Sequence, residues 1–513
     1  MTDEGSVRVN GRFVFSMTKA QRGLPTRIAW LTIPPMKQTM SRPVPRYDVL
    51  RFPLIGRFLR WRWGRLVLQL GMLGITAVML YDGFTGRQLA PTNLSTVITW
   101  VHFRGLVMLA LLLFGNLFCM SCPFTLPRTL ARKVSGSGRR WPKALRNKWL
   151  AIGVIFVYLW LYEWLDLWAS PLLTVWIILA YFVASFVLEA VFAESPFCKY
   201  VCPLGTFNFS SATISPTQIT VRSVDTCYTC VGKECVNGSV DANGNVDVLG
   251  CGTELFAPQI TSNMDCVFCL DCARACPYDN VALTVRNPLR EATTMGAWPR
   301  RWDLNLLILI YAFAAVGNAF GMVPPVYALE NQLGIWLNTD NEGLILLLIF
   351  GVIFVLLPVG LGTLAAWLSR ALAKRQEPLR VSLARYTPAF MPLAFAIWFA
   401  HFAGFHFLSS AGSLVPVFQE FMLDHRITLF GQPDWTMGPL LPMAWLDPLE
   451  LIVVLVGFAL SFYVLGVRAR RAEHKPDGFA AQLPWLALLL ALAVAAMVIL
   501  YLPMEMRGSA FMG

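Results

Sequence analysis

The sequence predicts an all-α polytopic membrane protein with about nine transmembrane helices, interrupted by one small cysteine-rich insert of mixed α+β type. The 513-residue chain has a mean hydropathy of +0.56, and only 14% of its residues are charged. That is too few charges for the surface of a water-soluble protein of this size. Several apolar stretches reach about 20 residues, which is the length that a helix needs to cross the hydrocarbon core. Eight of the twelve cysteines lie in one hydrophilic stretch, residues 206–300.

Nine segments of the chain are apolar and long enough to be predicted membrane helices. These are residues 65–82, 97–118, 149–168, 171–193, 303–323, 343–368, 387–410, 446–466 and 483–503. They leave a basic N-terminal arm before the first span and a long hydrophilic insert between the fourth and fifth spans. The last five spans contain no cysteine.

The loops between the predicted spans alternate in charge. Residues 124–148 carry eight Lys and Arg and no acid, whereas residues 324–342 carry three acids and no Lys or Arg. The loops 369–386 and 467–482 are again basic, and 411–445 is acidic overall. Because Lys and Arg concentrate in cytoplasmic loops, we expect a multi-pass protein of a bacterial-type inner (cytoplasmic) membrane. Its N-terminus and cysteine-rich insert would be cytoplasmic and its C-terminus outside.

The arm, residues 1–63, carries twelve Lys and Arg and no isolated apolar core, so we expect no secretory signal. It ends in RFPLIGRFLRWRW at residues 51–63, where arginines alternate with aromatic residues. This segment predicts either an interfacial helix at the membrane surface or a plain basic flank. The net charge of +12 follows from the same positive-inside bias. We therefore expect membrane lipid, and no nucleic acid, as a partner.

The insert contains a Cys-x2-Cys-x2-Cys-x3-Cys-Pro run, formed by Cys266, Cys269, Cys272 and Cys276. This spacing is typical of bacterial ferredoxins, in which the fourth cysteine of a run binds the other cluster. A second, less regular group precedes it at Cys227, Cys230, Cys235 and Cys251. Structural disulfides are rare in the cytosol, so metal ligation is the leading interpretation.

The crossed rule assigns the eight cysteines to two [4Fe-4S] clusters. Cluster 1 takes Cys227, Cys230, Cys235 and Cys276, and cluster 2 takes Cys251, Cys266, Cys269 and Cys272. A zinc ribbon built from Cys-x2-Cys pairs is the alternative, but the full run ending in Cys-Pro favours the clusters. We thus expect a small α+β bacterial-type two-cluster ferredoxin domain, in which metal binding and folding are coupled.

The other four cysteines lie in an internal repeat. GNLFCMSCPF at 115–124 and ESPFCKYVCPLG at 194–205 each follow a pair of predicted helices and each end in Cys-Pro. The repeat would bring together four thiols at the inner membrane face, those of Cys119, Cys122, Cys198 and Cys202. Three roles are open for these thiols: a further metal centre, a redox-active dithiol relay, or structural packing.

The cysteine layout together with the paired helices resembles the NapH/NosR/CcoG-type membrane-bound 4Fe-4S ferredoxin-like (polyferredoxin) proteins, over about residues 65–285. The resemblance implies electron transport through cytoplasmic clusters and, from CcoG-like members, reduction of copper. The family carries Cys-x3-Cys-Pro at both membrane pairs. Cys198 and Cys202 match that spacing, whereas Cys119 and Cys122 are one residue closer together. The 63-residue arm is too short for the flavin-binding region of NosR-type members, and no soluble C-terminal domain of the CcoG type follows, so no single subtype is expected.

Three histidines and one arginine are predicted to lie within the outer half of the membrane. They are His102, Arg104, His401 and His406. Intramembrane ionisable groups indicate function by default, and these residues predict a site for haem b, a site for a quinone or quinol, or a structural role. His401 and His406 are five residues apart, so on a regular helix they are expected to point to different sides. Glu163 and Asp166 are the candidate partners of Arg104.

Four parts are expected in the chain: the arm, a four-helix membrane domain at 64–205, the ferredoxin-like domain at 206–300 and a five-helix membrane domain at 301–513. No Walker, Rossmann or nucleophile motif occurs. We expect an electron-transfer component of an oxidoreductase system. It would pass electrons between a quinol or cysteine-linked membrane site and a redox partner protein, such as a respiratory complex. Two alternatives are a copper reductase or assembly factor for a respiratory enzyme, and a non-catalytic membrane anchor for a redox complex.

Overall fold

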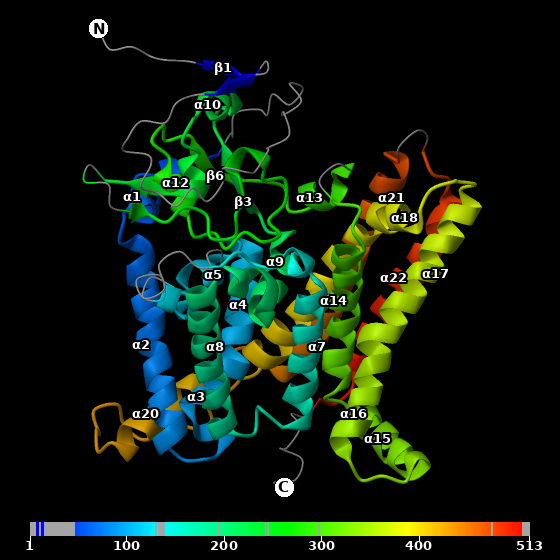
Figure 1. Cartoon of the computed structure of the whole chain (residues 1–513). Helices are drawn as coiled ribbons and strands as arrows, with labels where there is room; N and C mark the ends of the chain where they lie inside the picture. Colours follow the sequence, from blue (N-terminus) through cyan, green and yellow to red (C-terminus); the bar gives the residue numbers. More distant parts are fainter. Residues whose placement is uncertain are drawn as a thin grey trace.

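Two parts make up the computed structural model of the chain: a large bundle of membrane-type helices and a smaller mixed domain at one end of it (Figure 1). The structure describes residues 7–9, 12–14, 47–128, 131, 139–192, 195–241, 243, 246–295, 298–472 and 476–504. The predicted arm therefore lies outside the described residues for most of its length. The exceptions are the short antiparallel strands β1 (Val7–Val9) and β2 (Arg12–Val14) and the part from residue 47 onward.

Eight helical segments of the described chain are long and apolar enough to cross a membrane. They are α2 (Gly64–Thr85), α3 to α4 (Leu94–Leu113), α8 (Pro171–Val191), α14 (Trp302–Phe320), α16 to α17 (Glu342–Leu372), α18 to η12 (Leu379–Leu408), α21 (Met443–Arg470) and α22 (Phe479–Tyr501). Each of them overlaps one predicted span, so the prediction of a multi-pass membrane protein is confirmed. The ninth predicted span is the 16-residue helix α7 (Trp149–Trp164). At 1.5 Å per residue it reaches only about 24 Å of the roughly 30 Å core.

Shorter helices connect these segments. They are α1 (Ile55–Arg60), α5 (Leu117–Ser121), α9 (Pro203–Ala212), α10 (Val224–Thr229), α11 (Glu234–Asn237), α12 (Asp271–Ala275), α13 (Arg290–Thr293), α15 (Pro324–Leu337) and α20 (Leu414–Asp424). The predicted domain boundary at residue 205 falls inside α9, which begins at Pro203 directly after a cysteine.

The membrane helices differ greatly in how much of each is buried inside the protein. In α14, 94% of the apolar window is buried, against 28% in α2 and 33% in α8. Buried residues surround α14 on every face from Asp303 to Ala319. A helix that is apolar all round and buried all round is a central helix, so α14 is the axis of the bundle. The apolar faces of α2 and α8 that remain exposed are suited to contact lipid.

Four π-helical turns interrupt the helices: η4 (Val97–Phe103), η7 (Phe197–Val201), η10 (Val352–Leu356) and η12 (Ala400–Leu408). Such turns are rare and are frequent at functional sites. The turn η12 packs closely on α4 (Arg104–Leu113), because Gly105 has no side chain: a Cβ there would lie 2.2 Å from Cβ of Phe407. This contact joins the N-terminal and C-terminal membrane helices.

The small domain is built on one antiparallel pair, β3 (Thr217–Val221) with β6 (Val281–Val285). Both cysteine groups of the insert lie between these two strands in sequence. A short hairpin, β4 (Ser239–Val240) with β5 (Val246–Val248), forms in the stretch between Cys235 and Cys251. The described end of the arm adds to the same domain: Asp48 bridges to Thr284, and Leu50 is fully buried in the core. Residues 47–50 thus belong to the insert.

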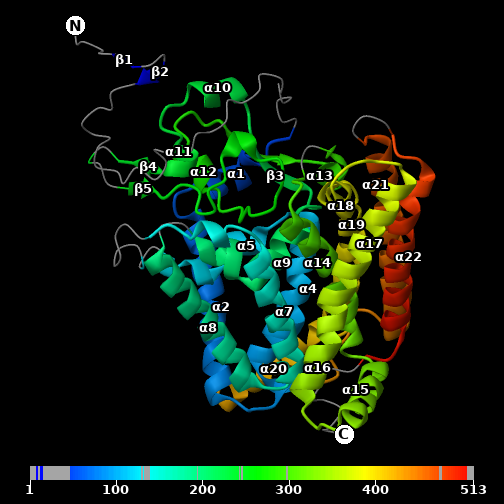
Figure 2. The ribbon, with the colours of Figure 1, turned by 45° about the vertical axis from the view of Figure 1, so that its right-hand side comes forward.

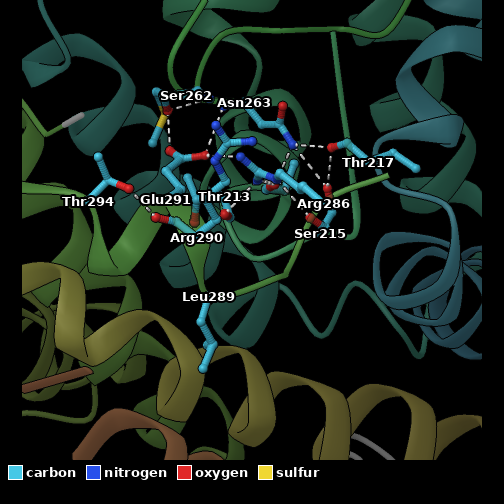
Figure 3. A network of polar contacts seen from close by, with 12 residues as sticks. Thr213, Ser215, Thr217, Ser262, Asn263, Arg286, Leu289, Arg290, Glu291 and Thr294 are labelled. Atoms are coloured by element: carbon cyan, nitrogen blue, oxygen red, sulfur yellow. Dashed lines mark hydrogen bonds and ion pairs between the residues drawn. The ribbon is translucent and has the colours of Figure 1, made fainter. Parts of the chain in front are cut away.

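A buried polar network joins the insert to α9, the short helix between it and the bundle (Figure 3). Arg286 forms an ion pair with Glu291 at 3.0 Å and donates to the carbonyl oxygens of Ala212, Thr213 and Ser215 at the end of α9. Both charged side chains are at most 1% exposed. The insert is therefore held in a defined position on the helices rather than tethered loosely.

Candidate functional site

All twelve cysteines are free thiols in the structure, and they fall into three groups of four. The first group lines one small cavity in the insert, where Phe256 and Tyr278 also contribute. Its members are Cys227, Cys230, Cys235 and Cys276. The fold thus gathers around one cavity the four residues predicted for cluster 1, including the distant Cys276. Their role as ligands stays a prediction.

The second group surrounds α12. Burial raises the pKa of the Cys272 thiol well above its usual value, and the charges of Cys269, Cys251 and Cys266 raise it further. Burial also raises the pKa of Cys266, and again Cys251 and Cys269 add to the effect. These four cysteines, predicted for cluster 2, are therefore close neighbours in space, although Cys251 is separated from the others by 14 residues or more in sequence.

The third group consists of the two Cys-Pro pairs, at α5 and at the start of α9. Burial raises the pKa of Cys119 to about 11 and that of Cys202 to about 12. Cys198 lies near enough to both of them, and to Cys122, for their charges to raise its own pKa beyond the effect of burial. A dithiol relay requires a lowered thiol pKa. Burial has the opposite effect on these four thiols, and their role as metal ligands, relay or packing stays open.

The three groups adjoin one another in a series. The charge of Cys235 in the first group acts on Cys272 in the second. The charge of Cys119 in the third group acts on Cys266 in the second, and Asn116 next to this pair donates to the Cys266 carbonyl at 3.1 Å. Figure 1 shows α5 and α9 directly between the insert and the membrane helices. The series therefore runs from the insert to the end of the membrane bundle.

Several cysteine sulfurs accept hydrogen bonds from nitrogen donors. Asn280 Nδ2 lies 3.2 Å from Cys227 Sγ, Leu255 N lies 3.3 Å from Cys251 Sγ, and Gly205 N lies 3.2 Å from Cys202 Sγ. Asn208 Nδ2 reaches Cys119 Sγ at 3.4 Å. Hydrogen bonds to ligand sulfurs stabilise the thiolate form and set the potentials of iron–sulfur centres.

Backbone strain is concentrated in the same loops. Of the ten described non-glycine residues with positive φ, six lie within three residues of an insert cysteine. They are Lys233, Glu254, Asp265, Phe268, Leu270 and Asp279. Such conformations cost free energy and persist where a site needs a particular chain path. Here they turn the chain tightly around the sulfurs.

The cysteine donor set bears on two kinds of metal centre, iron–sulfur clusters and a single zinc ion. Within the described ranges, no three His, Cys, Asp or Glu side chains are placed to hold one metal ion together. A zinc site would bring four thiolates to about 2.3 Å from one ion. In a cubane each thiolate binds a different iron atom, so its four ligands are spaced more widely. Sulfurs around one cavity, with nitrogen donors directed at them, form a donor set that either centre accepts, and the assignment to clusters stays a prediction.

Two apolar cavities lie in the membrane domain directly next to the Cys-Pro pairs. They share Phe103, Arg104, Tyr158 and Leu204 in their walls. One of them also contacts Pro203 and Asn208, and the other contacts Pro123. Each of these residues directly follows a cysteine of the third group or bonds to one. An apolar ligand in these cavities would therefore lie beside the membrane end of the cysteine series.

Arg104 lies between the two cavities, but without the predicted carboxylate partner. Its guanidinium stacks on Trp100, Tyr162 and Phe402 at 4.5 to 4.9 Å, and it donates to Tyr162 Oη at 3.3 Å. Among the described residues it has no ion pair, so the expected contact with Glu163 or Asp166 is not found. The positive charge of Arg104 borders apolar cavity space, where it can contact the polar headgroup of a ligand.

The histidines are not arranged as the sequence suggested. His401 and His406 face each other, with their Nε2 atoms 3.3 Å apart, because the π-helical turn η12 places residues five apart on one side. The prediction that they point to different sides, which assumed a regular α-helix, is wrong. Two imidazoles in contact leave no room for a porphyrin between them. His102 lies apart from them, and both of its ring nitrogens contact backbone carbonyls, those of Val97 and Ala411, at 3.0 Å.

Sequence reasoning missed several residues of this region. Arg65 at the start of α2 forms an ion pair with Asp271 at 3.0 Å and lies within electrostatic reach of cysteines from two groups. Lys148 pairs with Asp265, the neighbour of Cys266. Asn208 and Asn280 bond to sulfur. Asn280 lies close to a cysteine motif in sequence, four residues after Cys276.

Comparison with protein-family models, with curated proteins and with solved structures found no match to this chain.

Proposed function

We propose that this protein is an integral membrane electron-transfer protein. The observation that carries the proposal is the unbroken series of three four-cysteine groups, from the insert to the inner ends of the membrane helices. Electron transfer between water and membrane needs such a series, because each step has to be short. All twelve cysteines of the chain belong to this series.

The two groups of the insert would hold one [4Fe-4S] cluster each. Cys227, Cys230, Cys235 and Cys276 would hold the first, and Cys251, Cys266, Cys269 and Cys272 the second. When bound, such clusters accept and donate single electrons. The protein would fix their positions and, through Asn280 and the backbone N–H groups, raise their potentials. The four membrane cysteines would hold a further metal centre.

At the membrane end, the electron donor or acceptor would be a quinone or quinol bound in the cavities around Arg104. Their walls are apolar apart from a few polar groups, which is the usual composition of a small-molecule site. Arg104 and Asn208 would contact the polar headgroup, and the rings of Phe103 and Tyr158 would contact its apolar face. At the other end, a redox partner protein would meet the first cysteine group, whose neighbours Tyr228, Val231 and Tyr278 are exposed. The basic loops favour a cytoplasmic position for this end.

A second function is favoured by the gathering of the four membrane thiols. Soft thiolate ligands select Cu(I), so the same group would suit a copper reductase or assembly factor. The cysteine series would then supply the electron that reduces Cu(II). Copper bound after purification, lost in Cys122→Ser and Cys198→Ser, would favour this function over quinol chemistry.

Metal and sulfide analysis of the full chain, purified without oxygen, tests the proposal. Two cubanes would give about eight irons and eight sulfides per chain, and a third cubane in the membrane group about twelve. Paramagnetic resonance of the reduced protein should show interacting clusters, because the groups adjoin. Zinc in place of iron, or no metal with the fold retained, would overturn the electron-transfer function.

A further inference from the structure

The C-terminal bundle contains a buried group of titratable residues that electron transfer alone does not use. His401 is fully buried and His406 is 3% exposed, and the two share one close contact between their Nε2 atoms. His401 Nδ1 is buried with no hydrogen-bond partner. A buried polar atom without a partner costs roughly 1–3 kcal/mol, so its presence calls for a reason other than packing.

Glu450 of α21 lies against the same π-turn. The nearest atoms to the missing side chain of Gly404, which lies between the two histidines, belong to Glu450, with Oε1 at 3.0 Å from an ideal Cβ. Glu450 is 3% exposed. Three residues earlier on the same face of α21 is Asp447, which is exposed and acts electrostatically on Glu450. Glu450 and Asp447 thus lead from the π-turn of the histidines to the surface.

This surface lies on the side of the membrane away from the insert. The other end of α21 touches the insert side, where Arg468 donates to the Ala292 carbonyl at 2.7 Å. Asp447 precedes Arg468 by 21 residues on one continuous helix, which at 1.5 Å per residue is roughly 30 Å. Figures 1 and 2 show the insert at one end of the bundle and α20, which closely follows η12, at the other.

The histidine pair is one side chain, that of Phe402, away from the cavity of the proposed function. Phe402 lines that cavity, and its ring centroid lies 5.3 Å from His401 and 5.9 Å from His406. Arg104, in the wall of both cavities, is close enough for its charge to act on both histidines. Arg104 of α4 acts electrostatically on the pair, Glu450 of α21 lies against Gly404 of the same π-turn, and both ring nitrogens of His102 of η4 contact carbonyl oxygens.

We propose that His401, His406, Glu450 and Asp447 form a proton relay that connects the cavity with the side of the membrane opposite the insert. The proposal rests on the proposed function and names its substrate class, a hydroquinone. Oxidation of one hydroquinone releases two electrons and two protons. The electrons leave singly through the cysteine groups. Each hydroxyl proton passes to an imidazole nitrogen, then to the Glu450 carboxylate, and through Asp447 to water.

The relay would make electron transfer electrogenic, because electrons and protons leave toward opposite sides. The fixed positive charge of Arg104 disfavours the protonated, positively charged form of the two imidazoles. It therefore favours transfer of the proton from the imidazoles to Glu450. Chains of Asp, Glu and His within membrane segments are the usual proton pathways of membrane proteins.

The test uses the full chain in liposomes with a trapped pH dye, duroquinol as the donor and external ferricyanide as an impermeant one-electron acceptor. Ferricyanide selects the molecules whose insert faces outward. For the unaltered protein we expect one proton in the lumen per electron transferred. Glu450→Gln and His406→Gln should lower quinol oxidation and lumen acidification at least tenfold, and Glu450→Asp should retain most of both.

His425→Gln is the matched control, because His425 is exposed on the same side of the membrane and contacts Tyr81 rather than the relay. Iron content has to be unchanged in every variant, which separates loss of the relay from loss of the clusters. Variants that oxidise duroquinol and acidify the lumen at the full rate would overturn the relay alone. Unaltered protein that takes electrons from dithionite but not from duroquinol would overturn the quinol site and the relay together.

Discussion

The N-terminal cysteine region, residues 47–300, and the C-terminal bundle, residues 301–504, bury opposite kinds of chemistry. The cysteine region contains all twelve cysteines, and its membrane helices α2 and α8 are mostly exposed. The C-terminal bundle contains no cysteine, and two of its segments are 94% and 78% buried. Its polar groups are imidazoles, arginines and carboxylates within that core, such as His401, Arg468 and Glu450.

The difference shows how each region holds its reactive groups. The cysteine region takes its sulfurs from loops and short helices, and it needs residues with positive φ to wrap the chain around them. The C-terminal bundle takes its imidazoles from one long helix and needs only a π-turn to bring two of them together. The sulfurs of one group come from several chain directions at one point, whereas the two imidazoles come from neighbouring turns of a single helix.

The largest expected effect is a loss of iron, which we expect from substitutions in the cysteine region and not from those in the C-terminal bundle. Cys269→Ser removes one ligand of the second cysteine group, and we expect iron to fall from about eight to about four per chain, because one cubane is lost. Electron transfer from the membrane to a soluble acceptor should stop, since the second group is the middle of the series. Iron analysis and paramagnetic resonance measure both changes.

His401→Gln in the C-terminal bundle is the matched variant, because its side chain is equally buried but belongs to the other region. It should keep all the iron and the same resonance spectrum. Equal iron loss in both variants would contradict the proposal that the cysteine region alone binds the iron.

The next largest effect concerns the network that fixes the insert. Arg286→Met leaves the Glu291 carboxylate buried and unpaired, and it removes three donors from the end of α9. Removing one partner of a buried ion pair costs about 3–5 kcal/mol. Thermal unfolding followed by circular dichroism should show a clear decrease in stability. Arg62→Ala is the control, since the Arg62–Asp247 pair at 4.0 Å is largely exposed and is expected to contribute about 0–1 kcal/mol.

A smaller effect is expected where the two regions meet. Gly105→Ala places a methyl group 2.2 Å from Cβ of Phe407, so α4 and η12 have to separate. Overpacking of this kind costs about 1–3 kcal/mol. It should also slow quinol oxidation, because Arg104 and Phe402 lie next to the contact. Gly71→Ala, in a part of α2 where nothing lies within 4 Å of the added Cβ, should be neutral in both measurements.

The sequence predicted the membrane helices well because burial in lipid demands long apolar runs, and these are visible residue by residue. At α7 the apolar run continues to Trp168 but the helix ends at Trp164, four residues before the predicted end of the span. The sequence prediction failed at His401 and His406, since a π-turn changes which residues share a face and leaves no mark in hydropathy.

The cysteine groups illustrate what spacing can and cannot indicate. Short spacers indicated which cysteines are neighbours, and the repeat indicated that the two Cys-Pro pairs meet. Spacing gave no hint of Arg65, of Lys148 or of the arm residues Asp48 and Leu50, which reach the insert from distant parts of the chain. Such contacts are settled by tertiary packing.

The smallest expected effect is a shift in the reduction potential of one cluster, not a change in the stability of the protein. Asn280→Leu removes the donor that lies 3.2 Å from Cys227 Sγ. This hydrogen bond stabilises the more negative, reduced state, so its loss should make one cluster harder to reduce. A difference of about 1 kcal/mol between the two redox states corresponds to roughly 40 mV for one electron. A redox titration followed by paramagnetic resonance measures the shift. Asn305→Leu, at a buried amide of the C-terminal bundle that bonds Trp298 and Thr387, should leave both potentials unchanged. An equal shift in the two variants would contradict the view that the amide at Asn280 acts on its neighbouring sulfur.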